Sequence, residues 1–302
     1  MKKYETILGL IIAFFIFSSC SKDYRENGSP EYIAKINNWH KERIENLKKE
    51  NGWLNLVGLY WLKKGDNKFG SDKSNDIIFP EGKAPKFIGS LILEDSTVTA
   101  KINPDAEVKS GGVKIISLKL KDDLHGETVL ESGSLRWFII KRGDKYGVRL
   151  RDLNSDLLKN FTGIDTYPVN SNWRFEASLE PYPAPKKVLI QNVLGQIDSV
   201  LVPAALKFEK EGIVYRIDPL DAGRQYFILF ADETSGNETY GSGRFLYADK
   251  TDSTGKIIID FNKAYNPPCA FTKYATCPLP PQQNYLKMNI TAGEKMFHGA
   301  GH

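Results

Sequence analysis

The sequence predicts an all-β protein with one N-terminal helix, and three observations support this fold class. Aromatic residues make up 12% of the 302 residues, which favours β-strands. The periodicity of a helical protein rich in alanine and leucine is nearly absent after residue 50. From Trp53 onward, short apolar stretches alternate with Gly, Asn, Asp and Pro. This pattern predicts a β-sandwich followed by an antiparallel β-barrel or sandwich.

The N-terminus is predicted to be an export signal. Two lysines precede the apolar run Ile7–Phe17, which is too short to span a bilayer and suits the apolar region of a secretory signal. Two serines then lead into Cys20, and this end resembles the lipobox of bacterial lipoproteins, in which the cysteine is acylated. We expect residues 1–19 to be a lipoprotein signal peptide and residues 20–29 a tether. A plain secreted protein and an uncleaved anchor are the alternatives.

The composition excludes some function classes. The formal net charge of +4 is too small to predict a nucleic-acid partner. The sequence has no nucleotide-binding glycine motif and no internal repeat. No histidine lies between His125 and His298, so metal-ligand spacings and the usual serine or cysteine triad are missing from the second half. We expect no cofactor and no metal, with a membrane as the partner of the lipid on Cys20.

Residues 30–52 are predicted to form an amphipathic helix. Its bulky residues recur at helical spacing: Ile33, Ile36, Trp39 or His40, Arg43 or Ile44, and Leu47. Asn51 and Gly52 provide the C-terminal stop signal. Because no partner ligand accompanies His40, we expect this histidine to be packed or solvated.

Residues 53–155 are expected to form a β-sandwich that resembles a forkhead-associated domain. The resemblance is carried by residues 65–102, which read as a strand, a Gly-Ser-Asp turn, an Asn-Asp-Ile strand start and a paired meander. In that family an arginine after the glycine, and a serine and a histidine in the next loop, grip phosphothreonine. Here Ser71 follows Gly70, and the loop EGKAPKFIG contains neither serine nor histidine. The resemblance therefore implies the scaffold without phosphopeptide binding.

The hairpin of residues 134–152 carries three arginines, and their two-residue period places them partly on one face of the hairpin: Arg142, Arg149 and Arg151. We expect solvated or ion-paired surface charges. A grip on an anion is the alternative.

Residues 156–302 are predicted to form the antiparallel β domain. Eight short strands are expected at residues 173–180, 186–193, 199–210, 213–220, 225–232, 243–249, 256–262 and 286–293.

Two polar clusters follow predicted strand ends in this half. One contains Asp232, Thr234, Thr239, Tyr240 and Arg244, and the other contains Asp260, Asn262, Tyr265 and Asn266. If the three strands that carry them are neighbours, Asp232, Arg244 and Asn262 lie near one edge. An arginine beside carboxylates and tyrosines suits recognition of a carboxylate, a sulfate or sugar hydroxyls. The alternative is that Arg244, Asp260 and Asn262 satisfy the backbone groups of the proline-rich loop that follows.

That loop, Asn262–Asn284, contains five prolines and two cysteines, so no regular helix or central strand is expected in it. If Cys20 carries lipid, Cys269 and Cys277 are the remaining pair in an oxidising compartment, and we expect a disulfide. Such a bond would restrict the unfolded chain by about 2 to 3 kcal/mol. A reactive thiol is the alternative, but only Lys273 lies nearby in sequence to lower a thiol pKa.

Three segments together resemble the bacterial and archaeal family of unknown function 1684. They are GWLNLVGLYWLKKGDNKFGSD, FADETSGNETYGSGRFLY, and DFNKAYNPPCAFTKYATCPLPPQQNYL with a closing AGEK. The resemblance covers nearly all of the chain after residue 19 and implies no established activity.

From the residues we expect a noncatalytic envelope lipoprotein, at the outer membrane, that binds a glycan, a peptide or a small anion. The candidate ligand-binding residues are Asp232, Tyr240, Arg244, Asp260, Asn262, Tyr265 and Asn266. The alternative function is a hydrolase in which Asp232 and Asp260 act as acid and base.

Overall fold

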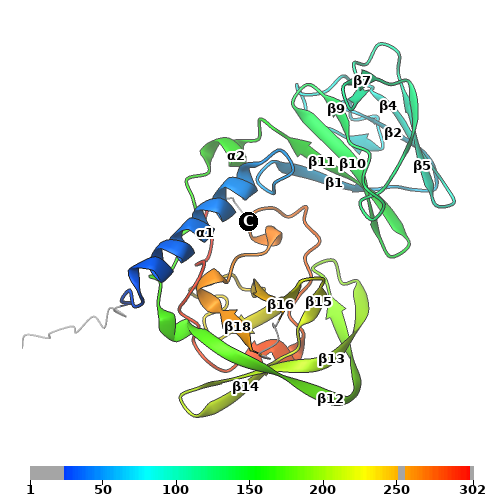
Figure 1. Cartoon of the computed structure of the whole chain (residues 1–302). Helices are drawn as coiled ribbons and strands as arrows, with labels where there is room; N and C mark the ends of the chain where they lie inside the picture. The colour runs from blue at the N-terminus through cyan, green and yellow to red at the C-terminus, as the bar shows by residue number, and fades with distance from the viewer. Residues whose placement is uncertain (1–23, 251–255, 300–302) are drawn as a thin grey trace, which may run out of the picture.

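The computed structural model describes residues 24–250 and 256–299 (Figure 1). The predicted signal peptide and the predicted lipidation site at Cys20 lie outside these ranges. Within them, no helix combines the length and the apolar character needed to cross a membrane.

Helix α1 runs over Pro30–Lys48, inside the range predicted for it. It begins at Ser29, whose Oγ accepts a hydrogen bond from the Tyr32 amide at 3.2 Å, and proline suits the first helical position. The helix ends four residues before the predicted limit, because the chain turns at Lys49 and the Gly52 amide bonds the Lys49 carbonyl at 2.8 Å. Figure 1 shows α1 extending along the C-terminal sheets towards the N-terminal sandwich.

Two facing sheets form the N-terminal β-sandwich. The first contains, in order, β1 (Leu56–Trp61), β11 (Lys145–Asp152), β10 (Leu135–Arg142), β9 (Leu130–Ser132), β6 (Lys109–Ser110) and β7 (Val113–Lys114). The second contains β3 (Ile77–Ile78), β2 (Gly65–Gly70), β4 (Gly89–Glu94), β5 (Thr97–Ile102) and β8 (Ser117–Leu120). Edge-to-face contacts among Phe69, Phe79 and Trp137 fill the space between the sheets.

The turn after β2 contains Ser71, which stands where the forkhead-associated family has its phosphate-binding arginine. Gly70 has φ +157°, and a Cβ added there would lie 2.3 Å from the Lys86 carbonyl oxygen, so glycine is required by the close approach of the next loop. The Ser71 hydroxyl donates to the Ala84 carbonyl at 2.8 Å. Ser71 therefore ties two loops of the sandwich together.

The C-terminal half is built from two open sheets, and the described residues form no closed barrel. One sheet contains β14 (Ile213–Ile217), β13 (Ile197–Lys210), β12 (Arg174–Gln191) and β18 (Ile257–Asp260). The other contains β15 (Leu220–Ala222), β16 (Gln225–Asp232) and β17 (Arg244–Asp249), with β19 (Tyr285–Leu286) parallel to β16. Phe208, Phe230 and Phe261 lie in the core between them. The predicted all-β class with one long helix is confirmed.

Several predicted strands differ from the observed ones. The strands expected at residues 173–180 and 186–193 are one strand, β12, which continues through its prolines with an irregularity between Pro181 and Lys186. Strand β18 pairs with β12 rather than with β17. Of the strand expected at residues 286–293, only Leu286 is in β19, because carbonyls farther along bond an arginine side chain instead of a neighbouring strand.

Short helical turns complete the fold: α2 (Asp156–Asn160), η1 (Ser171–Trp173), η2 (Phe261–Lys263), η3 (Pro268–Ala270) and η4 (Gln282–Asn284). The described part of the predicted tether lies against the C-terminal half. The Tyr24 ring contacts Tyr167 edge to face at 5.1 Å, and Asn27 forms a β-bridge with Asn170.

Candidate functional site

The first candidate cluster is an interior ion pair. Arg244, at the start of β17, donates to Asp232, at the end of β16, over 2.9 Å, and both side chains are fully buried. The same guanidinium donates to the carbonyls of Ile290 and Ala292 at 2.9 and 2.5 Å. The other Asp232 oxygen accepts bonds from the Thr234 amide and hydroxyl. These two candidate ligand-binding residues therefore connect two strands to the C-terminal segment, and their side chains have no exposed surface.

The second cluster holds helix α1. The Tyr32 hydroxyl donates to the Asp260 carboxylate, with distances of 2.9 and 3.0 Å to its two oxygens, and accepts from Asn262 Nδ2 at 3.0 Å. Burial and the Asp260 charge raise the pKa of Tyr32, so this hydroxyl stays protonated. Asn262 also bonds both backbone groups of Asn170 at 2.9 Å. Asp260 and Asn262 thus bond helix α1 and η1, and Asp260 also accepts the Asn262 amide at 3.1 Å at the start of the proline-rich loop.

Two further helical residues, His40 and Arg43, lie on the same face as Tyr32. The His40 Nε2 is 2.9 Å from the Asn262 carbonyl oxygen, and Arg43 donates to the Asn266 carbonyl at 2.9 Å. Residues 32, 36, 40, 43 and 47 lie on one face of the helix because of its 3.6-residue period. This face of α1 contacts the first residues of the proline-rich loop. It is the side of α1 that the sequence predicts to be buried.

Glu294 is the acid opposite Arg43, and it is 1% exposed. Its Oε1 lies 3.4 Å from Arg43 Nε, and its Oε2 accepts the Asn266 amide at 2.7 Å. Burial raises the pKa of Glu294, and the Arg43 charge opposes that shift. The guanidinium of Arg43 lies 4.6 Å from the centre of the Tyr265 ring. Tyr265 and Asn266 are therefore part of the docking site for α1.

Tyr240, the remaining candidate, contributes its ring to two apolar clusters. It shares them with Trp53. The candidate residues thus separate into an interior ion pair, a helix-docking network and one packed tyrosine.

A pocket of about 730 Å³ lies between α1 and the ends of β17 and β18, and we call it the α1 pocket. Among the seven candidate residues, Asp260 is the one that lines it. Its rim carries Lys35, Arg174, Lys250, Lys256 and Lys263, and its walls include the rings of Trp39 and Tyr247. Successive side chains of β17 point to opposite faces of the sheet, and Tyr247 lies on the exposed face, where it lines the pocket with 43% of its surface exposed.

The rim charges are only partly compensated. Lys256 contacts Glu176 at 2.9 Å, and Lys250 contacts Asp221 at 2.6 Å. In contrast, Lys35, Arg174 and Lys263 make no salt bridge with any residue in the described ranges. Asp260 faces this pocket with its oxygens bonded to Tyr32. The α1 pocket therefore has a positive rim beside aromatic surface, which suits an anionic ligand.

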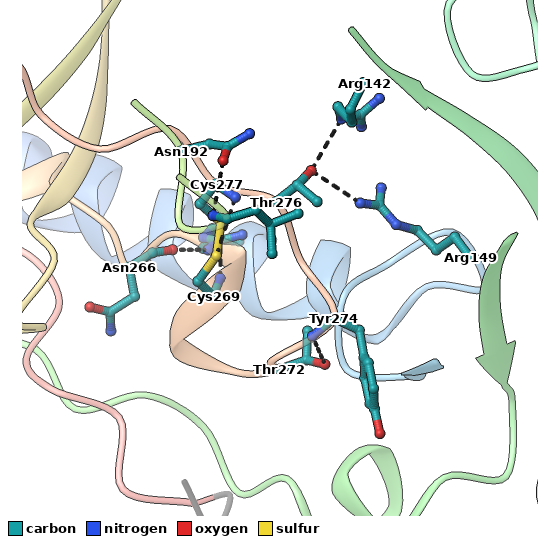
Figure 2. Close-up of a disulfide and its surroundings, with 11 residues drawn as sticks. Arg142, Arg149, Asn192, Asn266, Cys269, Thr272, Tyr274, Thr276 and Cys277 are labelled. Atoms are coloured by element: carbon teal, nitrogen blue, oxygen red, sulfur yellow. Dashed lines mark hydrogen bonds between the residues drawn. A yellow bond between two sulfur atoms is a disulfide. The ribbon is translucent and has the colours of Figure 1, made fainter. Parts of the chain in front are cut away.

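The structure joins Cys269 and Cys277 in a disulfide with a Cα–Cα distance of 6.1 Å, as the sequence predicts. Figure 2 shows the bond next to Thr276, towards which Arg142 and Arg149 point from the sandwich. Both sulfur atoms are buried and accept backbone amides of the same loop, Cys269 N at 3.1 Å and Cys277 N at 3.3 Å. In this setting the pair closes the loop.

We did not predict from the sequence that Tyr32, Arg43, Glu294 or the pocket lysines belong to a site. The helical period marks Arg43 as facing inward, so the signal for it was present. Glu294 follows a short non-strand segment, and nothing in its spacing indicates burial. Lys35 lies in α1 and Lys263 in η2, whereas Lys250 follows β17 and Lys256 precedes β18, so only the fold brings these lysines together.

No curated protein matches the chain. A solution NMR structure of an uncharacterized protein from Haloarcula marismortui is 29% identical, over 45% of this chain and 78% of that chain, with a TM-score of 0.38. The crystal structure of the FHA domain of FhaA, complexed with an intracellular domain of another protein, is 12% identical over 31% of this chain and 97% of that chain, with a TM-score of 0.23. Residues 159–295 match the family described as "Protein of unknown function (DUF1684)", so the match covers the C-terminal half and not the N-terminal sandwich.

Proposed function

We propose that the protein is a noncatalytic cell-envelope lipoprotein, anchored through Cys20, that binds a small acidic saccharide in the α1 pocket. The observation that supports this is the group of three rim cations without a carboxylate partner, Lys35, Arg174 and Lys263, beside exposed aromatic rings. Exposed ammonium and guanidinium groups attract a carboxylate, and an aromatic face packs against a sugar ring. The size of the pocket suits one or two sugar units.

A peptide or an uncharged glycan fits the pocket less well. A neutral ligand would leave the rim cations uncompensated. An extended peptide would bind best along a free strand edge, whereas this pocket is closed on one side by helix α1.

The hydrolase alternative lacks support from the arrangement of its carboxylates. Asp232 is fully buried against Arg244 and accepts bonds from Thr234, so no substrate can reach it. Asp260 and Asp249 both line the pocket. Asp260 is bonded to the Tyr32 hydroxyl, and Asp249 accepts a hydrogen bond from Gln225 Nε2 at 2.7 Å, so both carboxylates already have partners in the fold.

Binding is tested by isothermal titration of the full-length protein in detergent with a galacturonic acid disaccharide and with its neutral galactose counterpart. We expect the acidic sugar to bind and the neutral sugar to bind at least roughly tenfold more weakly, because the lost charge contacts are worth about 1.4 kcal/mol or more. The variant Lys35→Gln/Lys263→Gln should lose the preference for acid. Lys256→Gln is the matched control, since this rim lysine is already paired with Glu176. Equal binding of the two sugars, or an equal loss in the control, would contradict the proposal.

The anchor is tested by Cys20→Ala. We expect this change to release the protein from the membrane fraction, because the acyl chains would be missing. A cleaved Cys20→Ala protein that still sediments with membranes would rule out the lipoprotein.

A further inference from the structure

Strand β11 carries two buried arginines, Arg149 and Arg151, on the face that points away from the sandwich core. They are 4% and 8% exposed, so the sequence-based expectation of solvated charges is wrong for both. Neither makes a salt bridge with a residue in the described ranges, so the other part of that expectation, ion-paired surface charges, is also wrong for both. Arg151 instead donates hydrogen bonds to the Gly52 carbonyl and to Asn55 Oδ1, which offset the cost of burying its guanidinium.

Arg149 lacks comparable partners. Its one hydrogen bond among the described residues runs from Nη2 to Thr276 Oγ1 over 3.4 Å. Its Nε–H group is buried and has no acceptor among the described residues. Charge-assisted bonds of arginine are normally about 2.7 to 2.9 Å long. Burial, followed by the nearby Arg142 charge, lowers the pKa of Arg149 to about 10. The guanidinium remains protonated at neutral pH and underbonded.

Arg142 approaches the same hydroxyl from the end of β10. Its Nε donates to Thr276 Oγ1 at 3.2 Å, and its Nη1 donates to Asp123 at 2.7 Å (Figure 2 shows both arginines aimed at Thr276). Two guanidinium groups therefore meet at one hydroxyl, and a single carboxylate, Asp123, contacts the pair. Arg149 makes no salt bridge within the described residues, and the Trp53 ring, 5.4 Å from its guanidinium carbon, is the aromatic face beside it.

The position of Thr276 is fixed by the covalent structure of its loop. It precedes Cys277 in the disulfide, and the neighbouring Val193 amide bonds the Cys277 carbonyl at 3.0 Å. The side chains of Arg142 and Asp123 are 25% and 18% exposed, so the cluster opens to solvent on their side. From that side a small ion meets the partly exposed Arg142 guanidinium first, and Arg149 bonds the same Thr276 hydroxyl.

We propose that Arg142, Arg149 and Thr276 form a second binding site, separate from the α1 pocket, for a tetrahedral oxyanion such as a phosphate group. The two planar guanidinium groups supply paired N–H donors from two directions, and the hydroxyl of Thr276 supplies a third donor. One negative charge on the ligand neutralises the uncompensated charge of Arg149. A free phosphate ion and a phosphodiester headgroup share this chemistry.

The test is thermal unfolding and ³¹P NMR of the full-length protein at constant pH and ionic strength, with chloride replaced stepwise by inorganic phosphate. We expect phosphate to raise Tm above the chloride value and the ³¹P signal to broaden. A parallel titration with dimethyl phosphate separates the two sources: preference for the diester indicates a headgroup, and preference for phosphate indicates the free ion. Phosphate and dimethyl phosphate that both act no differently from chloride would overturn the proposal.

Variants locate the effect. Arg149→Gln should weaken phosphate binding by about tenfold or more, and Thr276→Val by less, because the charged donor contributes more than the hydroxyl. Arg216→Gln is the control, since this exposed arginine is paired with Glu180. Lys263→Gln should leave the phosphate effect intact, which distinguishes this site from the α1 pocket. A phosphate effect that persists in both Arg149→Gln and Thr276→Val would contradict the site, and if Arg149→Gln fails to fold, Arg142→Gln and Thr276→Val decide the question.

Discussion

Arg244 and Arg149 are both buried arginines on β-strands, yet their surroundings differ. Arg244 is 0% exposed, bonds Asp232, and donates to backbone carbonyls at 2.5 and 2.9 Å. Arg149 is 4% exposed and makes one long bond to a hydroxyl. The chain thus neutralises the charge of Arg244 by itself and leaves the charge of Arg149 open.

This difference separates structural polar groups from ligand-binding ones. Desolvating an ion costs several kcal/mol, and the fold recovers that cost only if the ion is paired and bonded. At Arg244 the Asp232 carboxylate and the carbonyls of Ile290 and Ala292 supply that recovery, although Arg244 Nε, like Arg149 Nε, has no acceptor among the described residues. At Arg149 it is incomplete, and a bound anion would complete it.

The largest expected effect is at the compensated site. Arg244→Met should lower the free energy of unfolding by about 3 to 5 kcal/mol, because Asp232 would be left buried without its partner. Urea denaturation measures this change. The double variant Arg244→Met/Asp232→Leu should recover part of the loss, since no charge would remain buried. A loss below about 1 kcal/mol in the single variant would show that Arg244 is not structural.

Removal of the disulfide is expected to have the next largest effect. Cys269→Ser/Cys277→Ser should cost less than the loop-entropy value of about 2 to 3 kcal/mol, because the flanking prolines already restrict the unfolded chain. Urea denaturation, with thiol titration of denatured, unreduced wild-type protein, provides the check. Two free thiols in protein isolated from its native envelope would contradict a structural disulfide. A Cys269→Ser variant that keeps normal stability but loses a specific activity would also contradict a structural disulfide.

A smaller effect is expected from His40, which docks α1 as a neutral ring. Burial lowers the pKa of His40, so the folded state binds its proton less readily than the unfolded state does. The stability that depends on the neutral ring is present above the unfolded pKa of about 6.5 and is lost as the pH falls towards the folded pKa. Each unit of difference is worth about 1.4 kcal/mol.

The His40 effect is measured as the difference in unfolding free energy between wild type and His40→Gln at pH 7.5 and pH 5. Subtracting the unfolding free energy of His40→Gln from that of the wild type removes the contribution of Glu294, which both proteins contain. That contribution has the opposite sign, because a raised pKa of Glu294 makes the stability of the protein fall as the pH rises. A pH dependence that is identical in the two proteins would exclude His40 as its source.

Much of the fold could be predicted from local patterns. The 3.6-residue period identified α1 and its buried stripe, and the alternation of apolar residues with turn residues identified the sandwich. The disulfide was predicted from cysteine spacing and the export signal. Strand pairing was harder, because the prolines of β12 read as a break and nothing local indicates that β18 pairs with β12.

The sites were predicted less well, for a physical reason. Strand-end positions brought Asp232 and Arg244 to one edge correctly, but burial depends on what covers that edge, and the covering segment around Ile290 lies 46 residues away from Arg244. The same limit applies to Arg149. The face of β11 that carries Arg149 was predicted. The loop that contacts Arg149 contains Thr276, which lies in the other half of the chain.

The most direct test of the account is the stability of Arg149→Met measured by urea denaturation, first without phosphate and then with it. Met retains much of the side-chain volume and removes the uncompensated charge. Without phosphate the variant should be at least as stable as wild type, because replacing a poorly paired buried ion by an apolar group is often neutral or stabilising. Added phosphate should stabilise wild type alone. A loss of about 3 kcal/mol or more in the absence of phosphate, as expected for Arg244→Met, would show that Arg149 is structural and that its charge is already satisfied.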